Sequence, residues 1–165
     1  MTVQELCEFN KERRIFQIGL VVADIDKAIE QWENVYHVGP WNRMYFTQEC
    51  VSNLIADPKA VKEGFAYHAA STMVGDVQVE LIEANETVPI FNDFLKKTGG
   101  GLHHIKEQIP DEKLPAVLEE YAQRGMPAVF GGFYYNANFY FMDTVDKLGV
   151  QIELGNCAKV VKPEK

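Results

Sequence analysis

The chain has 165 residues, of which 47% are hydrophobic and 24% charged, a composition typical of a folded protein with a buried core. Its net charge of −8 argues against nucleic acids and anionic membranes as partners, because both select a basic surface. No signal peptide or membrane-spanning run is evident, and the three cysteines lack CxxC spacing, so we expect a reduced, cytoplasmic protein.

The first half of the chain predicts strands around one helix. An apolar stripe with helical spacing follows Asp24, which predicts a helix over 25–36 with Asp24 as its cap. The irregular stretch 51–64 is expected to be a loop that covers a pocket. Strands are expected over 15–22, 41–47, 65–73 and 77–83, the last two joined as a hairpin.

The same order of elements then returns in the second half. A helix expected over 89–97 connects the halves, and Asp111 is expected to cap a further helix over 112–124. The tail from Ala158 onward shows no periodicity and is expected to fray. Strands are expected over 102–109, 128–135, 138–143 and 149–155.

One short strand occurs almost unchanged in both halves, as Val-Gln-Val-Glu-Leu at 77–81 and Val-Gln-Ile-Glu-Leu at 150–154. Each copy follows a glycine turn, and a similar first strand precedes it in its half. The chain therefore looks duplicated, with modules at about 14–86 and 100–156 within a single domain over 1–165. We predict an α+β fold in which two βαβββ modules form one curved mixed sheet.

Strand parity turns four metal-capable side chains toward the inside of that sheet. Side chains alternate between the faces of a strand, so the aliphatic residues pack on helices and the polar residues face a cavity. One divalent ion satisfies two carboxylates, an amide oxygen and an imidazole together. We therefore predict a metal-containing cavity whose ion (Zn, Co, Ni, Mn or Mg) keeps a position open for substrate. The ligands are Gln17, Glu80, His104 and Glu153.

Three stretches carry a family resemblance: Phe-Gln-Ile-Gly-Leu-Val-Val-Ala-Asp-Ile-Asp-Lys-Ala from Phe16, Gly-Leu-His-His-Ile from Gly101, and the repeated Val-Gln-Ile-Glu-Leu. The chain resembles the vicinal oxygen chelate superfamily over 14–156, and it looks especially like methylmalonyl-CoA epimerase. The resemblance implies a glyoxalase-like fold and a homodimer. Gln17 stands where such epimerases usually carry histidine, and the order Gln, Glu, His, Glu is similar to the ligand set of zinc-type glyoxalase I.

The resemblance implies a metal-dependent epimerase or racemase that abstracts and returns a proton next to a substrate carbonyl. By analogy Glu153 is the first choice for the base. Inversion of a stereocentre needs a second group, which is either Glu80 or His68. A two-residue turn in the hairpin sets Ser71 opposite Glu80 and turns His68 away, whereas a one-residue bulge brings His68 in.

The substrate stays open between two classes. An acyl-CoA carries several negative charges, and the arginines of the chain form no evident phosphate cluster. The strands are rich in aromatic residues, so an apolar or aromatic ketone, such as a flavonoid-like compound, is the rival, and Tyr140 is expected to contact it. Lys106 shares a face with His104 and is expected to bind a substrate anion. His103, on the opposite face, is expected to be structural.

Two alternatives to an epimerase follow from the same resemblance. The first is lactoylglutathione lyase (glyoxalase I) activity. The second is a non-catalytic resistance protein of the same fold that binds a small molecule. Members of the second kind typically lack the metal ligands, so the presence of all four favours an enzyme.

Overall fold

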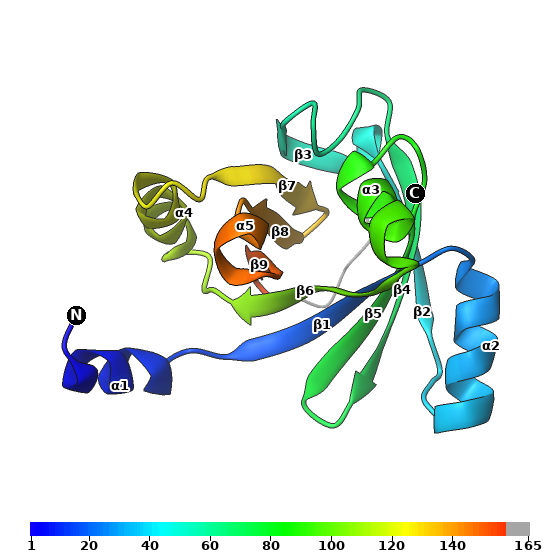
Figure 1. Ribbon diagram of the computed structural model, residues 1–165, viewed down its shortest axis with the longest axis horizontal. Coiled ribbons are helices and arrows are strands. Elements are labelled where there is room, and N and C mark those ends of the chain that lie inside the picture. Colours follow the sequence, from blue (N-terminus) through cyan, green and yellow to red (C-terminus); the bar gives the residue numbers. More distant parts are fainter. Residues whose placement is uncertain (158–165) are drawn as a thin grey trace.

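The computed structural model describes residues 1–157, which form an α+β structure of nine strands and five helices (Figure 1). The predicted fraying from Ala158 onward lies outside the described residues. The strands are β1 (Ile15–Val22), β2 (Asn42–Thr47), β3 (Val51–Ala56), β4 (Ala66–Val74), β5 (Val77–Glu83), β6 (Gly101–Gln108), β7 (Ala128–Tyr134), β8 (Ala137–Met142) and β9 (Gln151–Gly155). The helices are α1 (Val3–Lys11), α2 (Ile25–Tyr36), α3 (Pro89–Thr98), α4 (Leu114–Gln123) and α5 (Val145–Leu148).

The strands form one sheet in the order β2-β4-β5-β1-β6-β9-β8-β7-β3. In each half the first strand pairs in parallel with the last, β1 with β5 and β6 with β9. The two halves therefore have the same strand order, β1-β5-β4-β2 in the first and β6-β9-β8-β7 in the second. They join through the antiparallel pair of β1 and β6. This confirms the predicted α+β class with two βαβββ modules in one curved mixed sheet.

The sheet curls until its two edge regions approach each other. The ring of Phe46 on β2 lies with its centroid 4.1 Å from that of Tyr134 on β7. The Tyr134 hydroxyl donates to the backbone carbonyl of Tyr45 at 3.2 Å. A short 3-10 turn, Gln48–Cys50, leads directly from β2 at one edge to β3 at the other. The enclosed space is therefore nearly a barrel.

The expectation of a loop over 51–64 is wrong for its first part. Residues 51–56 form β3, which pairs with β7 in the register Val51 to Tyr134 and Ala56 to Phe130. The pairing is interrupted near Asn53, whose φ is 51°. The segment has no regular alternation of apolar residues, so its strand depends on the exposed edge of β7 rather than on its own pattern.

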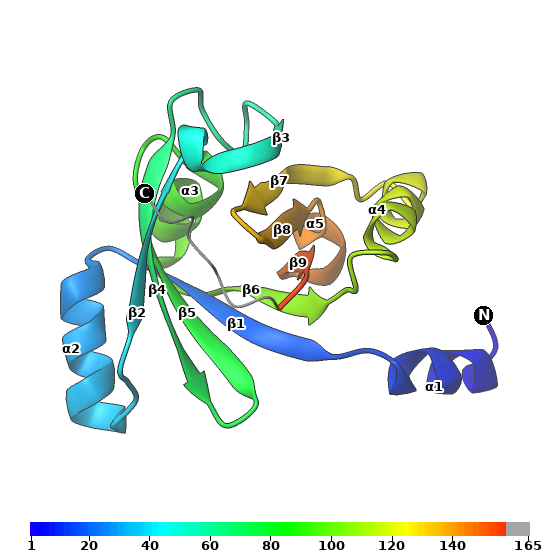
Figure 2. The ribbon, with the colours of Figure 1, turned by 180° about the vertical axis from the view of Figure 1, so that it is seen from behind.

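Helices cover the outer faces of the two modules (Figures 1 and 2). On α2, Ile25 and Ile29 belong to the same buried cluster as Leu81 of β5. On α4, Leu114 belongs to the cluster that contains Leu154 of β9. The aliphatic faces of the first and last strands thus pack against helices, which leaves the opposite faces for the cavity. Between residues 1 and 157, no helix combines the length and apolar character that spanning a bilayer requires.

The start of α4 differs from the expectation. The predicted cap Asp111 does not cap α4, which begins at Leu114 after Lys113 and has no side-chain cap. The Asp111 carboxylate instead accepts hydrogen bonds from the amides of Asn138 at 2.7 Å and Asn156 at 3.0 Å. These tertiary partners are distant in the sequence, so the local pattern could not reveal them.

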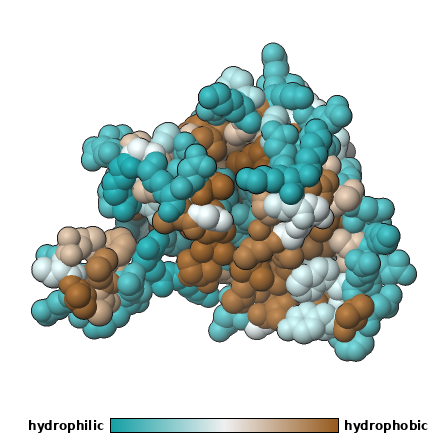
Figure 3. Space-filling view, viewed as in Figure 1, coloured by the Kyte–Doolittle hydropathy of each residue, from teal (hydrophilic) through white to brown (hydrophobic). Residues whose placement is uncertain are grey.

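Helix α1 was not expected and stands away from the body of the protein (Figures 1 and 3). A capping box at Thr2 and Glu5 starts it, with each side chain bonded to the other's backbone amide. The helix has no buried residue, and Leu6 and Phe9 are 44% and 49% exposed. Its formation therefore depends on local capping rather than on packing against the sheet.

The cap of α2 gives a first test of the fold. The Asp24 carboxylate accepts from the Lys27 amide at 2.9 Å, which satisfies one of the free amides at the helix start. We expect Asp24→Ala to lower the free energy of unfolding by about 1 kcal/mol, measured by urea denaturation. The control Glu30→Ala, at an exposed mid-helix position, should change it by less than about 0.5 kcal/mol. Equal losses in the two variants would contradict a capping role.

Candidate metal centre

Three buried residues from three strands converge inside the curved sheet. Glu80 of β5, His104 of β6 and Glu153 of β9 each present a ligand atom, and these atoms lie within 4.8 Å of one another. His104 Nε2 lies 3.4 Å from Glu80 Oε2 and 3.1 Å from Glu153 Oε2. The His104 side chain is 0% exposed. Two carboxylates and an imidazole at such spacing are suited to a divalent ion.

Strand register explains why these groups meet. Gly19 on β1 lies opposite Glu80 on one side and opposite His104 on the other. A Cβ built on Gly19 would lie 1.8 Å from His104 Cε1, so the imidazole lies directly across the glycine backbone. The absence of a side chain at Gly19 makes room for the ring. The sequence signal for this contact is a glycine in the middle of a strand whose other residues, apart from Gln17, are apolar or aromatic.

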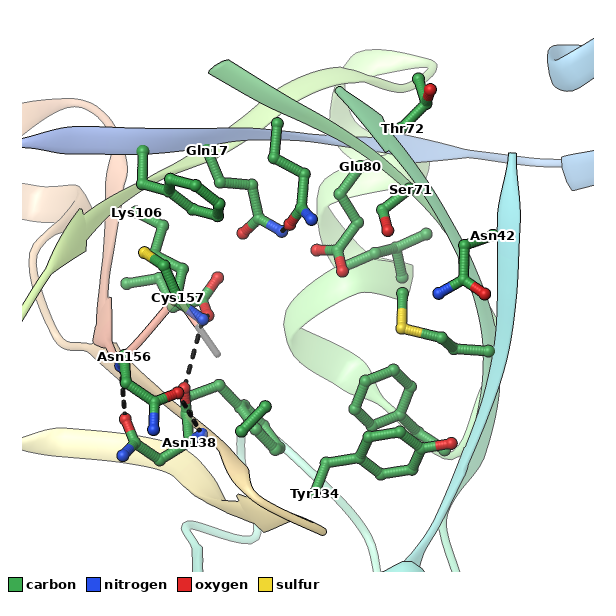
Figure 4. Close-up of a pocket in the computed structure, with 18 of the residues that line it drawn as sticks. Gln17, Asn42, Ser71, Thr72, Glu80, Lys106, Tyr134, Asn138, Asn156 and Cys157 are labelled. Atoms are coloured by element: carbon green, nitrogen blue, oxygen red, sulfur yellow. Dashed lines mark hydrogen bonds and ion pairs between the residues drawn. The ribbon is translucent and has the colours of Figure 1, made fainter. Parts of the chain in front are cut away.

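Gln17 completes the predicted set from β1 (Figure 4). Its Nε2 donates to Gln78 Oε1 at 2.6 Å, so the carboxamide is held in one orientation. Among the described residues, only two fully buried side-chain polar atoms lack a hydrogen-bond partner, Gln17 Oε1 and His104 Nε2. Orphaned buried polar atoms are uncommon, and both of these belong to the predicted ligand set. The donor set therefore fits a divalent cation.

The two carboxylate oxygens of Glu153 have different neighbours, and Lys106 binds one of them. Its Nζ lies 2.7 Å from Glu153 Oε1 and donates to the Asn138 carbonyl at 3.2 Å. The other oxygen, Oε2, faces His104. Lys106 is opposite both Gln17 and Glu153 in the strand register, and it is buried rather than extended to the rim. The ion pair thus fixes the orientation of the Glu153 carboxylate.

The charges of these groups shift one another's pKa values. Burial alone would lower the pKa of His104, but the adjacent carboxylates of Glu153 and Glu80 outweigh it and raise the pKa to about 9. Burial opposes ionisation of Glu153, yet Lys106 and His104 lower its pKa to about 2. Without a bound cation, the imidazole of His104 is therefore protonated at neutral pH and Glu153 is ionised.

A cavity of about 470 Å³ leads to these groups. Its lining contains Gln17, Glu80, Lys106 and Glu153, together with aromatic and aliphatic residues and further polar ones. The further polar residues include Asn42, Ser71, Thr72, Asn138 and Asn156 (Figure 4). Lys106 is the only lysine or arginine among the described lining residues. Apolar wall residues include Phe16, Met44, Phe46, Tyr134, Phe139 and Phe141.

Two predicted residues, the candidate second catalytic group His68 and the candidate substrate contact Tyr140, are not brought to the cavity. Ser71 lies opposite Glu80, as a two-residue turn requires, and His68 is exposed with its ring centroid 4.5 Å from that of Tyr45. The structure therefore keeps His68 away from Glu80. Tyr140 is a correction of another kind, because it is buried in the core cluster beneath α4 and is not among the described lining residues.

Tyr140 faces away from the cavity because side chains alternate between the two faces of β8. Phe141 lies opposite Glu153, and Phe139 and Phe141 line the cavity, so the residue between them must point to the other face.

His103, in contrast, does not follow the alternation of side chains along its strand. It is 4% exposed and lies beside His104, with the two Nδ1 atoms 3.1 Å apart, rather than on an opposite face.

Comparison with known proteins relates this geometry to a family. The model of the Glyoxalase/Bleomycin resistance protein/Dioxygenase superfamily matches residues 16–142. No curated protein matches the chain. A hypothetical protein from Bacillus halodurans C-125 has a similar structure, with a TM-score of 0.60 and 16% identity over 92% of this chain and 99% of that chain.

Methylmalonyl-CoA epimerases are also similar in structure. The one from Mycobacterium tuberculosis has a TM-score of 0.58 and 21% identity over 88% of each chain. A variant from Streptomyces coelicolor, in complex with 2-nitronate-propionyl-CoA, has a TM-score of 0.58 and 20% identity over 91% of this chain and 98% of that chain. At these identities the likeness shows the fold, and it confirms the glyoxalase-like fold that the sequence resemblance implied.

The contact between Gly19 and His104 gives a prediction for the site. We expect Gly19→Ala to displace the imidazole, to lower the free energy of unfolding by about 1–3 kcal/mol, and to weaken binding of Co²⁺ at least about tenfold. Urea denaturation and calorimetric titration measure the two effects.

Gly64→Ala is the matched control, because Gly64 has a φ of 72° and no atom within 4 Å of an added Cβ. Its backbone strain should cost about 1 kcal/mol without changing the affinity for Co²⁺. Unchanged Co²⁺ affinity in Gly19→Ala would contradict the close approach of His104 to this glycine.

Proposed function

The chain belongs to the Glyoxalase/Bleomycin resistance protein/Dioxygenase superfamily, and we propose that it is a metal-dependent epimerase or racemase. In this proposal it removes and returns a proton on the carbon next to a substrate carbonyl. The observation that carries the proposal is the buried group of Glu80, His104 and Glu153 at the cavity, beside the unpartnered oxygen of Gln17.

Four residues would hold the ion, namely Gln17, Glu80, His104 and Glu153. A divalent ion bound there supplies Lewis-acid chemistry, which stabilises negative charge on a carbonyl oxygen and so makes the neighbouring C–H bond more acidic. The aromatic and aliphatic residues of the cavity would hold the apolar part of the substrate. The substrate's carbonyl is thereby directed toward Glu80 and Glu153.

Glu153 is the proposed base. Lys106 keeps its carboxylate ionised and holds Oε1, which leaves Oε2 on the side of His104. A proton removed from one face of the substrate must be returned on the other face when a stereocentre is inverted. Glu80 is the proposed second group, because it comes from the other module and so approaches the cavity from a different strand.

The lining of the cavity supports the proposal that the substrate has a carbonyl group at one end and an apolar or aromatic body. Its described walls hold several aromatic rings and a single cation, Lys106, whose ammonium already contacts Glu153. The similar epimerases are named for methylmalonyl-CoA, but an acyl-CoA would need its phosphates held by residues other than those walls. We therefore propose an apolar ketone, with an acyl-CoA as the comparison substrate.

Glyoxalase I activity is a second candidate, which one observation favours. The first ligand position holds Gln17 rather than histidine, and its carboxamide is fixed by Gln78 with the oxygen left free. The amide oxygen of Gln17 is thus available as the first ligand in the order Gln, Glu, His, Glu, which is similar to that of zinc-type glyoxalase I. The hemithioacetal of glutathione and methylglyoxal therefore belongs among the substrates to be tested.

Metal titration tests the proposal directly. Since the pKa of His104 is about 9 in the metal-free protein, a ligand nitrogen must lose its proton at pH 7. We expect about one ion bound and about one proton released, and the dissociation constant should fall about tenfold per pH unit between about pH 6 and 8. Calorimetry with Zn²⁺ in buffers of different ionisation enthalpy measures both quantities.

His104→Gln is the matched variant for this titration, because glutamine offers a ligand oxygen without a proton to lose. Its residual Zn²⁺ binding should show no pH-linked proton release. Binding of less than about a tenth of an equivalent of Zn²⁺ by the unaltered protein would overturn the metal-dependent proposal.

The role of Glu153 is tested by hydrogen exchange at the substrate. We expect Glu153→Gln to slow deuterium incorporation at the acidic carbon by about 10²–10⁴-fold, because the amide cannot accept the proton. Mass spectrometry or NMR in D₂O follows exchange into aromatic ketones, 2-methyl acyl-CoA and the hemithioacetal. Glu119→Gln, an exposed carboxylate on α4, should leave the rate unchanged.

A further inference from the structure

His103 occupies an irregular position at the centre of the sheet. Gly19 pairs with His104 and Leu20 pairs with Leu102, so His103 is the extra residue of a bulge on β6. Regular alternation would turn two consecutive side chains to opposite faces, yet the Nδ1 atoms of His103 and His104 lie 3.1 Å apart, and the two residues are 4% and 0% exposed. The bulge therefore places two imidazoles side by side next to the metal centre.

The hydrogen bonds of His103 determine which of its nitrogens carries the proton. Its Nε2 lies 3.2 Å from the backbone carbonyl of Ile90 on α3. A carbonyl oxygen only accepts, so Nε2 must donate. The ring is surrounded by Phe91, Phe94 and Phe141, with centroids 5.2, 5.0 and 6.2 Å away, and no described residue forms an ion pair with it. This surrounding favours the neutral ring, with Nδ1 as an acceptor.

The next step in the chain of contacts is His104. The Nδ1 atoms of the two rings are 3.1 Å apart, and since His103 Nδ1 accepts, His104 Nδ1 must donate. A neutral His104 is then protonated at Nδ1, and its Nε2 carries the lone pair. This is the atom that lies between Glu80 and Glu153 and lacks a hydrogen-bond partner.

We infer that His103 is a positioning residue for the metal centre: through the backbone of Ile90 it holds His104 in the tautomer whose Nε2 can bind a cation. The inference rests on the proposed function only for the identity of the bound group. The tautomer itself follows from the protein's own contacts. A hydrogen-bonded partner on the outer nitrogen of a ligand histidine orients the ring and contributes about 10–100-fold to metal affinity.

NMR of the metal-free protein tests the hydrogen bond without any metal. With ¹⁵N-labelled histidine we expect His103 as the Nε2–H tautomer and a through-hydrogen-bond coupling between the Nδ1 atoms of His103 and His104. A His103 ring protonated at Nδ1 would overturn the inference. This readout stands apart from metal binding, so its result is informative even where the proposed function fails.

Two variants then measure the consequence for the ion. We expect His103→Phe to weaken Co²⁺ binding about 10–100-fold. This variant keeps an aromatic ring among the three neighbouring phenylalanines but removes the hydrogen-bond acceptor. His103→Gln retains one donor and one acceptor and should recover part of that loss. The absorption spectrum of bound Co²⁺ should also change in His103→Phe, because the ring of His104 is free to rotate.

Phe94→Leu is the packing control, because Phe94 contacts the His103 ring without a hydrogen bond. It should lower the thermal midpoint yet leave the Co²⁺ dissociation constant within about twofold. Equal Co²⁺ affinities for His103→Phe and the unaltered protein, with both folded by circular dichroism, would overturn the positioning role. Absence of Co²⁺ binding in the unaltered protein would instead overturn the proposed function.

Discussion

The antiparallel pairing of β1 with β6 is the constraint on which the candidate site depends. Each module alone brings together only the ligands on its own first and last strands, Gln17 with Glu80 and His104 with Glu153. The register that sets Gly19 opposite His104 joins these pairs into one group. Because a shift of this pairing by one residue would turn the ligands of one module away from those of the other, the register decides whether the four side chains meet at all.

Burial of so many polar groups requires mutual compensation. Glu80 and Glu153 bring two negative charges into a cavity with aromatic walls, and Lys106 and a protonated His104 balance them in the metal-free protein. Removal of one partner from such a group leaves an uncompensated buried charge, which is costly. The sheet therefore tolerates the cluster only as a set, and a divalent cation bound there would displace the proton of His104 rather than add to an already balanced site.

The sequence allowed the fold class to be predicted, and also which four side chains meet inside the sheet, because strand alternation and an internal repeat act over a few residues. The prediction was wrong where distant partners decide the structure. Residues 51–56 become a strand through the edge of β7, and Asp111 binds Asn138 instead of capping a helix. His103 escaped prediction because a bulge, which depends on pairing between β1 and β6, suspends the alternation on which the prediction relied.

The two modules carry different residues at one corresponding position beside the candidate ligands, and this difference makes the surroundings of the two carboxylates unequal. Gly19 and Lys106 each follow a proposed ligand by two residues, and each lies opposite the other module's ligand in the β1–β6 register. Glycine lets the His104 ring lie against the backbone. Lysine instead fills the equivalent space and binds Glu153. The duplicated frame therefore places a lysine beside only one of its two carboxylates, which distinguishes Glu153, the proposed base, from Glu80.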